Sequence, residues 1–115
     1  MQQPQEAEIR MLHAQVCQAL ADPTRLLLLY QLADGPKSVG ELAAALGTSQ
    51  PTVSRHLKVL RERGMARAER LGTTVMYSLT DVRVIQALDL MRAVLEDTLA
   101  QRGALATILG RHEER

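Results

Sequence analysis

Short polar and cationic side chains recur along one segment of the chain, between Gln50 and Arg61. An amide or a hydroxyl can hydrogen-bond the edge of a base, and a lysine or an arginine can neutralise a phosphate. Spaced along a helix, such side chains are suited to the major groove of DNA. We therefore expect base contacts from Gln50, Thr52, Ser54 and Arg55, and phosphate contacts from Lys58 and Arg61.

The segment from Thr48 to Gly64 has the signals of a helix that would hold those side chains. Ser49 can accept hydrogen bonds from the free amides of the first turn, and Pro51 is tolerated in that turn because it lacks a donor. Gly64 is placed to end the helix in a left-handed conformation. One apolar stripe is formed by Val53, Leu57 and Leu60. An ordinary amphipathic surface helix would show the same pattern, so the neighbouring elements decide the interpretation.

Two neighbouring segments favour a recognition helix. Ser38 and Glu41 match a capping box at the start of a short helix, so residues 38–64 are predicted to form a helix-turn-helix. In residues 66–79, side chains alternate between the two faces of a strand on both sides of a glycine turn. This pattern predicts a two-stranded hairpin, or wing. We expect its tip residues to contact the DNA backbone; the alternative is a hairpin exposed only to solvent. These tip residues are Arg70, Thr73 and Thr74.

The other helices are predicted to bury apolar surface. Residues 6–20 form a first helix, and Asp22-Pro23 begins a leucine-rich second helix whose run Leu26–Leu29 is apolar on all sides. A last helix carries a long apolar stripe that one small domain cannot cover. We therefore expect residues 1–20 and 81–109 to be dimerisation helices of a two-fold homodimer. The predicted fold is mainly α: a winged helix-turn-helix of five helices plus a two-stranded β-hairpin wing.

Length and composition agree with one small domain. The chain has 115 residues, 46% of them apolar, which suits a single domain spanning 1–115. No apolar run is long enough to span a bilayer and no secretory signal begins the chain, so we expect a cytoplasmic protein without a membrane partner. The net charge is only +1, but the stretch from Arg55 to Arg70 carries six cations and two acids. That local basic stripe is typical of a phosphate-binding surface, although a solvated charged face would give the same count.

The chain resembles the ArsR/SmtB family of small winged-helix repressors in four stretches. These are Leu20–Leu26 (LADPTRL), Ser38–Ala43 (SVGELA), Val53–Leu60 (VSRHLKVL) and Tyr77–Leu79 (YSL). Together they cover about residues 19 to 80. The resemblance implies a homodimer that binds a palindromic operator upstream of its own operon. It also implies that transcription is repressed until an inducer lowers the affinity for double-stranded DNA.

Two metal sites used by members of that family are not reproduced in this chain. Where some members place cysteines in the third helix, the sequence Glu41–Leu46 (ELAAAL) has no thiol. Other members pair an Asp and a His near the start of the last helix with two ligands about a dozen residues on. This chain has Asp81, but Arg83 stands in place of the histidine, and the later positions hold Val94 and Asp97.

His13 and Cys17 remain as candidate ligands, four residues apart on the first helix. They would bind nickel or zinc if the partner's last helix, or the terminal segment around His112, supplied further ligands. The alternative is a cysteine packed in the dimer interface beside a partly exposed histidine. An interface cysteine could also form an intersubunit disulfide or react with oxidants. The sequence therefore leaves the inducer open as a metal, a thiol oxidant or another compound.

These observations predict a sequence-specific DNA-binding transcriptional regulator that represses its own operon. The alternative is a winged-helix module that binds proteins and not DNA. An enzyme is not expected, because the sequence has no Gly-rich phosphate loop, no nucleophile paired with a base and no carboxylate cluster.

Overall fold

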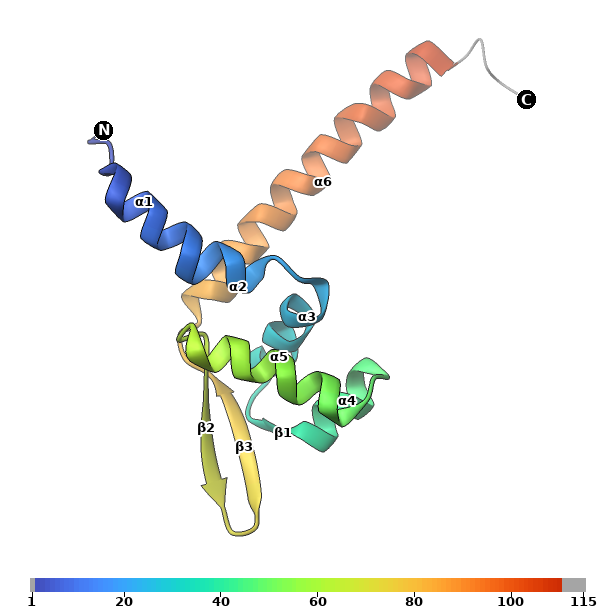
Figure 1. Ribbon diagram of the computed structural model, residues 1–115. Coiled ribbons are helices and arrows are strands. Elements are labelled where there is room, and N and C mark those ends of the chain that lie inside the picture. The colour runs from blue at the N-terminus through green and yellow to red at the C-terminus, as the bar shows by residue number, and fades with distance from the viewer. Residues whose placement is uncertain (1, 111–115) are drawn as a thin grey trace. The chain divides into compact units, whose positions relative to one another are not determined.

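The structure is a computed structural model that describes residues 2–110, apart from the side chains of 104–106 and 108–110. The chain divides into two compact units, Met1–Val82 and Arg83–Arg115. The first unit contains four helices and a small sheet, and the second is a long helix (Figure 1). A single domain spanning 1–115 stays a prediction.

The first helix runs without a break but changes its winding in the middle. It consists of α1 (Glu6–Leu12), the π-helical turn η1 (His13–Cys17) and α2 (Gln18–Leu20). The predicted bounds are confirmed, whereas the π turn was not predicted, because its hydrogen-bond pattern leaves no mark in the spacing of apolar residues. Ile9 and Leu12 are 45% and 46% exposed, and Ala19 near the end of the helix is buried.

Helix α3 (Pro23–Ala33) begins where the sequence predicts. Asp22 Oδ1 accepts hydrogen bonds from the backbone amides of Thr24 at 2.8 Å and Arg25 at 3.2 Å, so it caps the helix. The helix contributes to the core as expected, but within the apolar run Leu26–Leu29 the side chain of Leu27 is 56% exposed. At about 100° per residue, Leu27 points away from the buried residues of this helix. Those residues are Leu28, Leu29 and Leu32.

The helix-turn-helix consists of α4 (Val39–Leu46) and α5 (Gln50–Glu62). The capping box is present: Ser38 N donates to Glu41 Oε1 at 2.9 Å, and Glu41 N donates to Ser38 Oγ at 3.2 Å. Thr52 N donates to Ser49 Oγ at 3.3 Å, which confirms the predicted cap of α5. Gly64 has a φ of +77°, in the left-handed region predicted for the end of that helix.

The sheet has one strand more than predicted. The hairpin consists of β2 (Ala66–Leu71) and β3 (Thr74–Leu79), with Ala66 opposite Leu79 and Leu71 opposite Thr74. A short strand β1 (Lys37–Ser38) pairs antiparallel with β3, so the order is β1-β3-β2. Two residues are too few to show alternation, and pairing with the distant β3 creates this strand.

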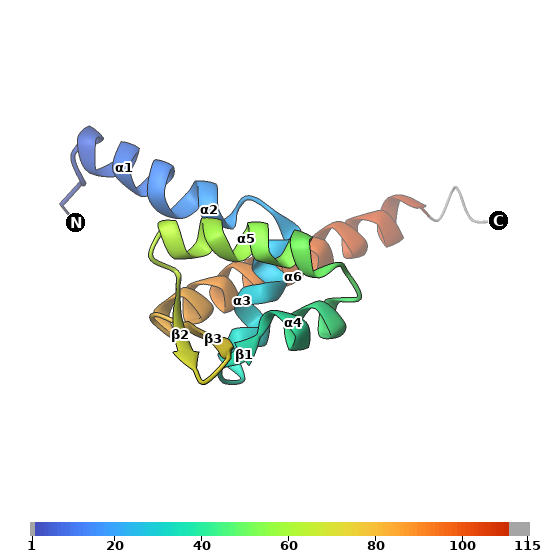
Figure 2. The same ribbon diagram turned by 60° about the horizontal axis from the view of Figure 1, so that its bottom comes forward.

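The core of the first unit lies between the helices and the sheet, as Figure 2 shows for α3, α4 and α5. Its largest fully buried side chains are leucines and one valine, each at most 2% exposed. They are Leu28, Leu29, Leu32, Leu42, Val53, Leu57 and Leu60. The buried stripe of α5 therefore lies where the sequence predicted it, and the polar side of α5 is left outside.

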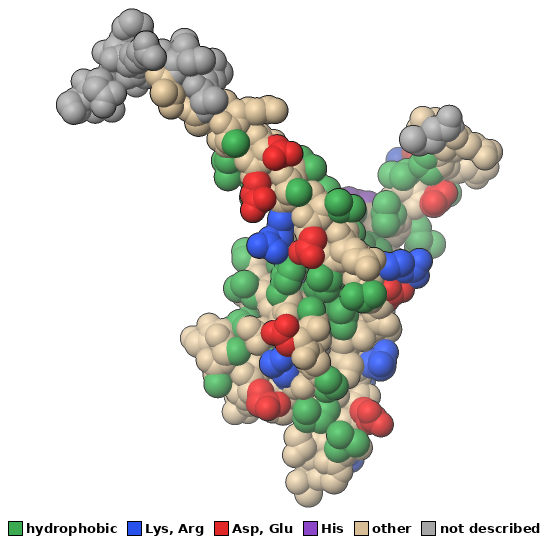
Figure 3. Space-filling view, turned by 180° about the vertical axis from the view of Figure 1, so that it is seen from behind, with side chains coloured by type: hydrophobic (Ala, Val, Ile, Leu, Met, Phe, Trp, Pro, Cys, Tyr) green, Lys and Arg blue, Asp and Glu red, His purple; other side chains and the backbone are tan. Residues whose placement is uncertain are grey.

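The second unit is helix α6 (Arg83–Gly110), which continues through Gly103. Its apolar residues are largely exposed in the single chain, from Leu99 at 53% to Leu90 at 69%. In the space-filling view, apolar side chains are exposed along this helix between acidic ones (Figure 3). No helix in the described part of the chain is long and apolar enough to cross a membrane.

Candidate nucleic-acid interface

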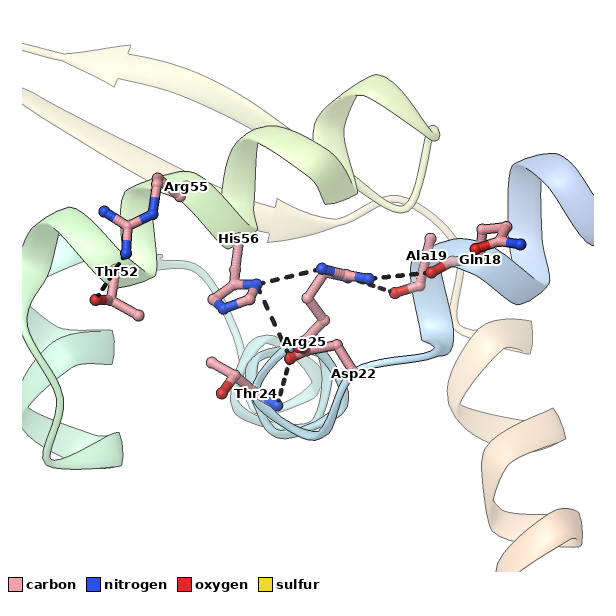
Figure 4. A network of polar contacts seen from close by, with 8 residues as sticks. All are labelled: Gln18, Ala19, Asp22, Thr24, Arg25, Thr52, Arg55 and His56. Carbon is pink, nitrogen blue, oxygen red and sulfur yellow. Dashed lines mark hydrogen bonds and ion pairs between the residues drawn. The ribbon is translucent and has the colours of Figure 1, made fainter.

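The fold leaves the predicted contact residues of α5 accessible. Val53, Leu57 and Leu60 are each 0% exposed, and this burial fixes the rotation of the helix about its axis. Along one exposed side the sequence then places Gln50, Ser54, Lys58 and Arg61, one above the other. Arg55 is exposed on the side of α5 away from His56 (Figure 4). This surface is open to a ligand, and its contact with DNA stays a prediction.

Thr52 differs from the other predicted contacts because its hydroxyl is already engaged within the chain. Its side chain is half-buried, and its Oγ1 accepts hydrogen bonds from Ser49 Oγ at 2.9 Å and from Arg55 Nη2 at 3.2 Å. Thr52 therefore orients the Arg55 guanidinium beside the start of α5 (Figure 4).

A polar network ties the opposite side of α5 to the first helix (Figure 4). The guanidinium of Arg25 donates from Nε to the carbonyl of Ala19 at 2.6 Å and from Nη2 to the carbonyl of Gln18 at 3.0 Å. Its Nη1 lies 3.3 Å from Nδ1 of His56, which must accept because a guanidinium has no acceptor. Asp22 Oδ1 lies 3.9 Å from the same ring nitrogen. Arg25 thereby joins the end of α2 to the middle of α5.

A second contact on this side comes from the end of α5, where Arg63 Nη1 donates to the carbonyl of Ala14 in η1. The positioning of α5 by Arg25, Asp22 and Arg63 was not predicted from the sequence. The signal for the first two was present in the stretch Leu20–Leu26, where the cap residue and the arginine lie three positions apart.

The wing presents its predicted contact residues at the end of the hairpin. Gly72 has a φ of +66°, which allows the tight turn between β2 and β3. Arg70, Thr73 and Thr74 are all exposed beside this turn. The structure therefore brings them to one tip, and their contact with a DNA backbone stays a prediction.

His13 and Cys17 lie on the same π-helical turn, and both are exposed. His13 Nε2 is 3.5 Å from Nε2 of Gln18, and His112 lies outside the described residues. Among the residues described, no group of three or more His, Cys, Asp or Glu side chains is placed to hold a metal ion. A protein zinc site needs at least three such ligands, so the described part of a single chain does not fit a nickel or zinc site.

Residues 22–68 match the family model described as "Bacterial regulatory protein, arsR family". The "Probable mercury resistance operon repressor" of Streptomyces lividans is 38% identical over 102 residues, which are 89% of this chain and 82% of that protein. The chain belongs to the arsR family. The resemblance seen in the sequence is thereby confirmed.

Two further relatives of this arsR-family protein come from mycobacteria. The regulator NmtR of Mycobacterium tuberculosis is 47% identical over 66% of this chain, and the match spans 63% of NmtR's own length. The homodimeric winged helix-turn-helix DNA-binding domain of Mb0332 from Mycobacterium bovis superposes with a TM-score of 0.73. It shares 31% identity, and the match covers 87% of this chain and 93% of that domain. The fold is accordingly a winged helix-turn-helix.

Proposed function

We propose that this protein is a homodimeric, sequence-specific DNA-binding repressor that acts on a palindromic operator. One observation carries the proposal: burial of the apolar stripe of α5 leaves an amide, a hydroxyl and cations exposed along a helix beside a wing. A helix with such side chains can hydrogen-bond base edges in the major groove while its cations neutralise phosphates. The regulators to which the chain is similar agree with this function.

The homodimer is supported by the surface of α6. Leu90, Met91, Val94, Leu95 and Leu99 are each more than half exposed in the single chain. Burying such side chains is favourable by about 1.5–3 kcal/mol each when burial is complete, and a second copy would cover them symmetrically. A homodimer would also place two copies of α5 on the two half-sites of a palindrome.

The inducer is the part of this proposal that needs a direct screen. The relative from Streptomyces is named for mercury resistance, and mercury is a soft metal that prefers thiolate ligands. Cys17 is exposed, so it is accessible to mercury(II) and to thiol oxidants. Mercury(II), nickel and zinc should therefore be tested beside an oxidant.

The proposal is tested by fluorescence anisotropy of the reduced protein on its own upstream DNA, at one fixed salt concentration. We expect tight binding to that DNA and at least 10³-fold weaker binding to a scrambled duplex. Equal affinity for the two duplexes would contradict sequence-specific binding. Absence of binding to either would favour the protein-interaction module.

Addition of each metal, or of the oxidant, to the bound complex identifies the inducer. Release by a metal that disappears in both His13→Ala and Cys17→Ser would assign the pair a sensing role. Release by the oxidant that disappears only in Cys17→Ser would make the thiol a redox switch. Binding that survives every addition would point to an organic inducer.

A further inference from the structure

A groove lies between the C-terminal half of α5 and the edge strand β2. It has a volume of about 470 Å³ and is open to solvent. Lys58, Arg61 and Glu62 line it from α5, and Ala66, Arg67 and Ala68 line it from β2. The proposed function uses Lys58 and Arg61 as separate phosphate contacts but gives no role to Arg67 or to the concave shape.

The chemistry of this groove suits a phosphate. Three cations against one carboxylate give its lining a charge of +2, and the cations come from two different elements. The side chains of Ala66 and Ala68 are single methyl groups, so they leave room between the long cationic side chains. A concave cationic surface concentrates field lines and attracts anions more strongly than separate surface charges do.

The position of the groove indicates which phosphate would enter it. Lys58 and Arg61 continue the exposed row that begins with Gln50 and Ser54, which we expect in the major groove. Strand β2 continues to Leu71, and Arg70 lies beside the turn that we expect at the DNA backbone. A duplex that contacts both elements would carry a sugar-phosphate strand across the interval between them, and the groove lies in that interval, between α5 and the start of β2.

We infer that the groove between α5 and β2 binds a backbone phosphate of the operator, with Arg67 as a phosphate ligand that joins Lys58 and Arg61. This inference rests on the proposed function. It joins the separate phosphate contacts expected of Lys58 and Arg61 into one defined site. Glu62 lies in the same lining, so it opposes the bound anion and moderates affinity for DNA of any sequence.

The first test compares Arg67→Gln with Arg83→Gln, which removes the same charge from an exposed position at the start of α6, about 120° around the helix from Leu95. Affinity is measured on operator and scrambled DNA at several salt concentrations. We expect Arg67→Gln to weaken binding about two- to fivefold on both duplexes and to reduce the salt slope by about 1. Arg83→Gln should change neither quantity by as much. Equal behaviour of the two variants would overturn the inference.

The second test locates the phosphate with operator duplexes that each carry one neutral methylphosphonate. We expect a methylphosphonate at one position, between the major-groove half-site and the adjoining minor groove, to weaken binding by the wild-type protein. The same substitution should have little further effect on Arg67→Gln, because both changes remove one interaction. Additive losses at every position would show that Arg67 acts at a distance and would overturn the site.

A third variant gives a gain of affinity that a misfolded protein cannot imitate. Glu62→Gln should strengthen binding to both duplexes about two- to fivefold, because a carboxylate beside a bound phosphate is repulsive. No change would mean that the groove lies beyond the screening length of about 8–10 Å from the DNA, which contradicts the inference.

Two outcomes separate this inference from related possibilities. Thermal stabilisation by inorganic phosphate that requires Arg67, together with additive methylphosphonate losses, would show that the groove binds a free anion and not the backbone. Tight, specific operator binding that is unchanged in Arg67→Gln and Glu62→Gln would overturn the inference and leave the proposed function intact. Absence of operator binding by the wild type would overturn both.

Discussion

Arg55 is the exposed cation on α5 that we expect to read a base. Its guanidinium is oriented by Thr52, and helical spacing places it on the side of the helix opposite the buried stripe. Arg55→Ala should weaken operator binding by about 1–3 kcal/mol, because a bidentate bond to a base edge is lost. Anisotropy titrations on operator and scrambled DNA at equal salt measure this loss.

Lys58→Ala is the matched control for that loss of specificity. A lysine that contacts a phosphate contributes charge and no sequence information. Its removal should therefore weaken binding to both duplexes equally, and it should reduce the slope of log affinity against log salt concentration by about 1. If Arg55→Ala instead weakened binding to both duplexes equally, Arg55 would be a second phosphate contact.

Arg25 and His56 form one of the two polar contacts described between α5 and the first helix. Arg25→Lys keeps the charge but removes the planar fork that holds Ala19, Gln18 and His56 together. We expect the free energy of unfolding to fall by about 1–2 kcal/mol, because carbonyls at the end of α2 lose charged donors. Chemical denaturation measures this change, and an unchanged midpoint would show that water replaces the guanidinium without cost.

At the residue scale, the sequence predicts which side chains are exposed on α5 but not how they are used within the chain. Helical spacing was enough to place Gln50, Ser54, Arg55, Lys58 and Arg61 on the accessible surface, because the three buried positions fix the rotation of the helix. The contacts of Arg25 with His56, and the place of Arg67 in a groove, depend on how segments far apart in sequence pack together. Spacing alone does not contain that information.

At the scale of elements, the helix ends were predicted well and the sheet incompletely. Asp22, Ser38 and Ser49 cap their own helices through bonds that span two or three residues, so a short stretch of sequence determines each start. Strand β1 exists only because Lys37 and Ser38 meet Tyr77 and Met76 of β3. A local pattern cannot reveal a strand that a distant partner creates.

The end of α5 provides a stability test of one predicted backbone conformation. Gly64 has a φ of +77°, and a Cβ added there would meet no atom within 4 Å. Gly64→Ala should therefore lower the free energy of unfolding by about 1–2 kcal/mol through the left-handed backbone alone. Thermal and denaturant unfolding measure the loss, and an unchanged stability would contradict the strained conformation.

Gly103→Ala is the natural comparison for Gly64→Ala. Gly103 lies within α6, and an added Cβ again meets no atom within 4 Å. Because alanine is a better helix former than glycine, we expect helix stability to rise by about 0.5–1 kcal/mol. Helix content followed by circular dichroism should therefore increase in this variant.

At the scale of the whole molecule, the proposed repression requires that two chains associate. Five large apolar residues of α6 are each more than half exposed, and clustered exposure of this kind marks an interaction surface. Each chain alone carries one recognition helix, and a palindrome has two half-sites, so specific affinity requires both copies. Dimerisation and operator affinity should accordingly be lost together.

Leu95→Glu tests that dependence. The new carboxylate would be desolvated at the proposed interface, which is unfavourable unless it is paired, so we expect dissociation to monomers at micromolar concentration. Ala93→Glu introduces the same side chain about 160° away around the helix and should leave the dimer intact. Sedimentation equilibrium measures the mass, and anisotropy measures operator affinity, which should fall at least 10²-fold only in Leu95→Glu.

If Leu95→Glu remained a dimer and Ala93→Glu did not, the other side of α6 would be the interface. If both variants bound the operator as monomers, symmetric recognition of a palindrome would have to be abandoned.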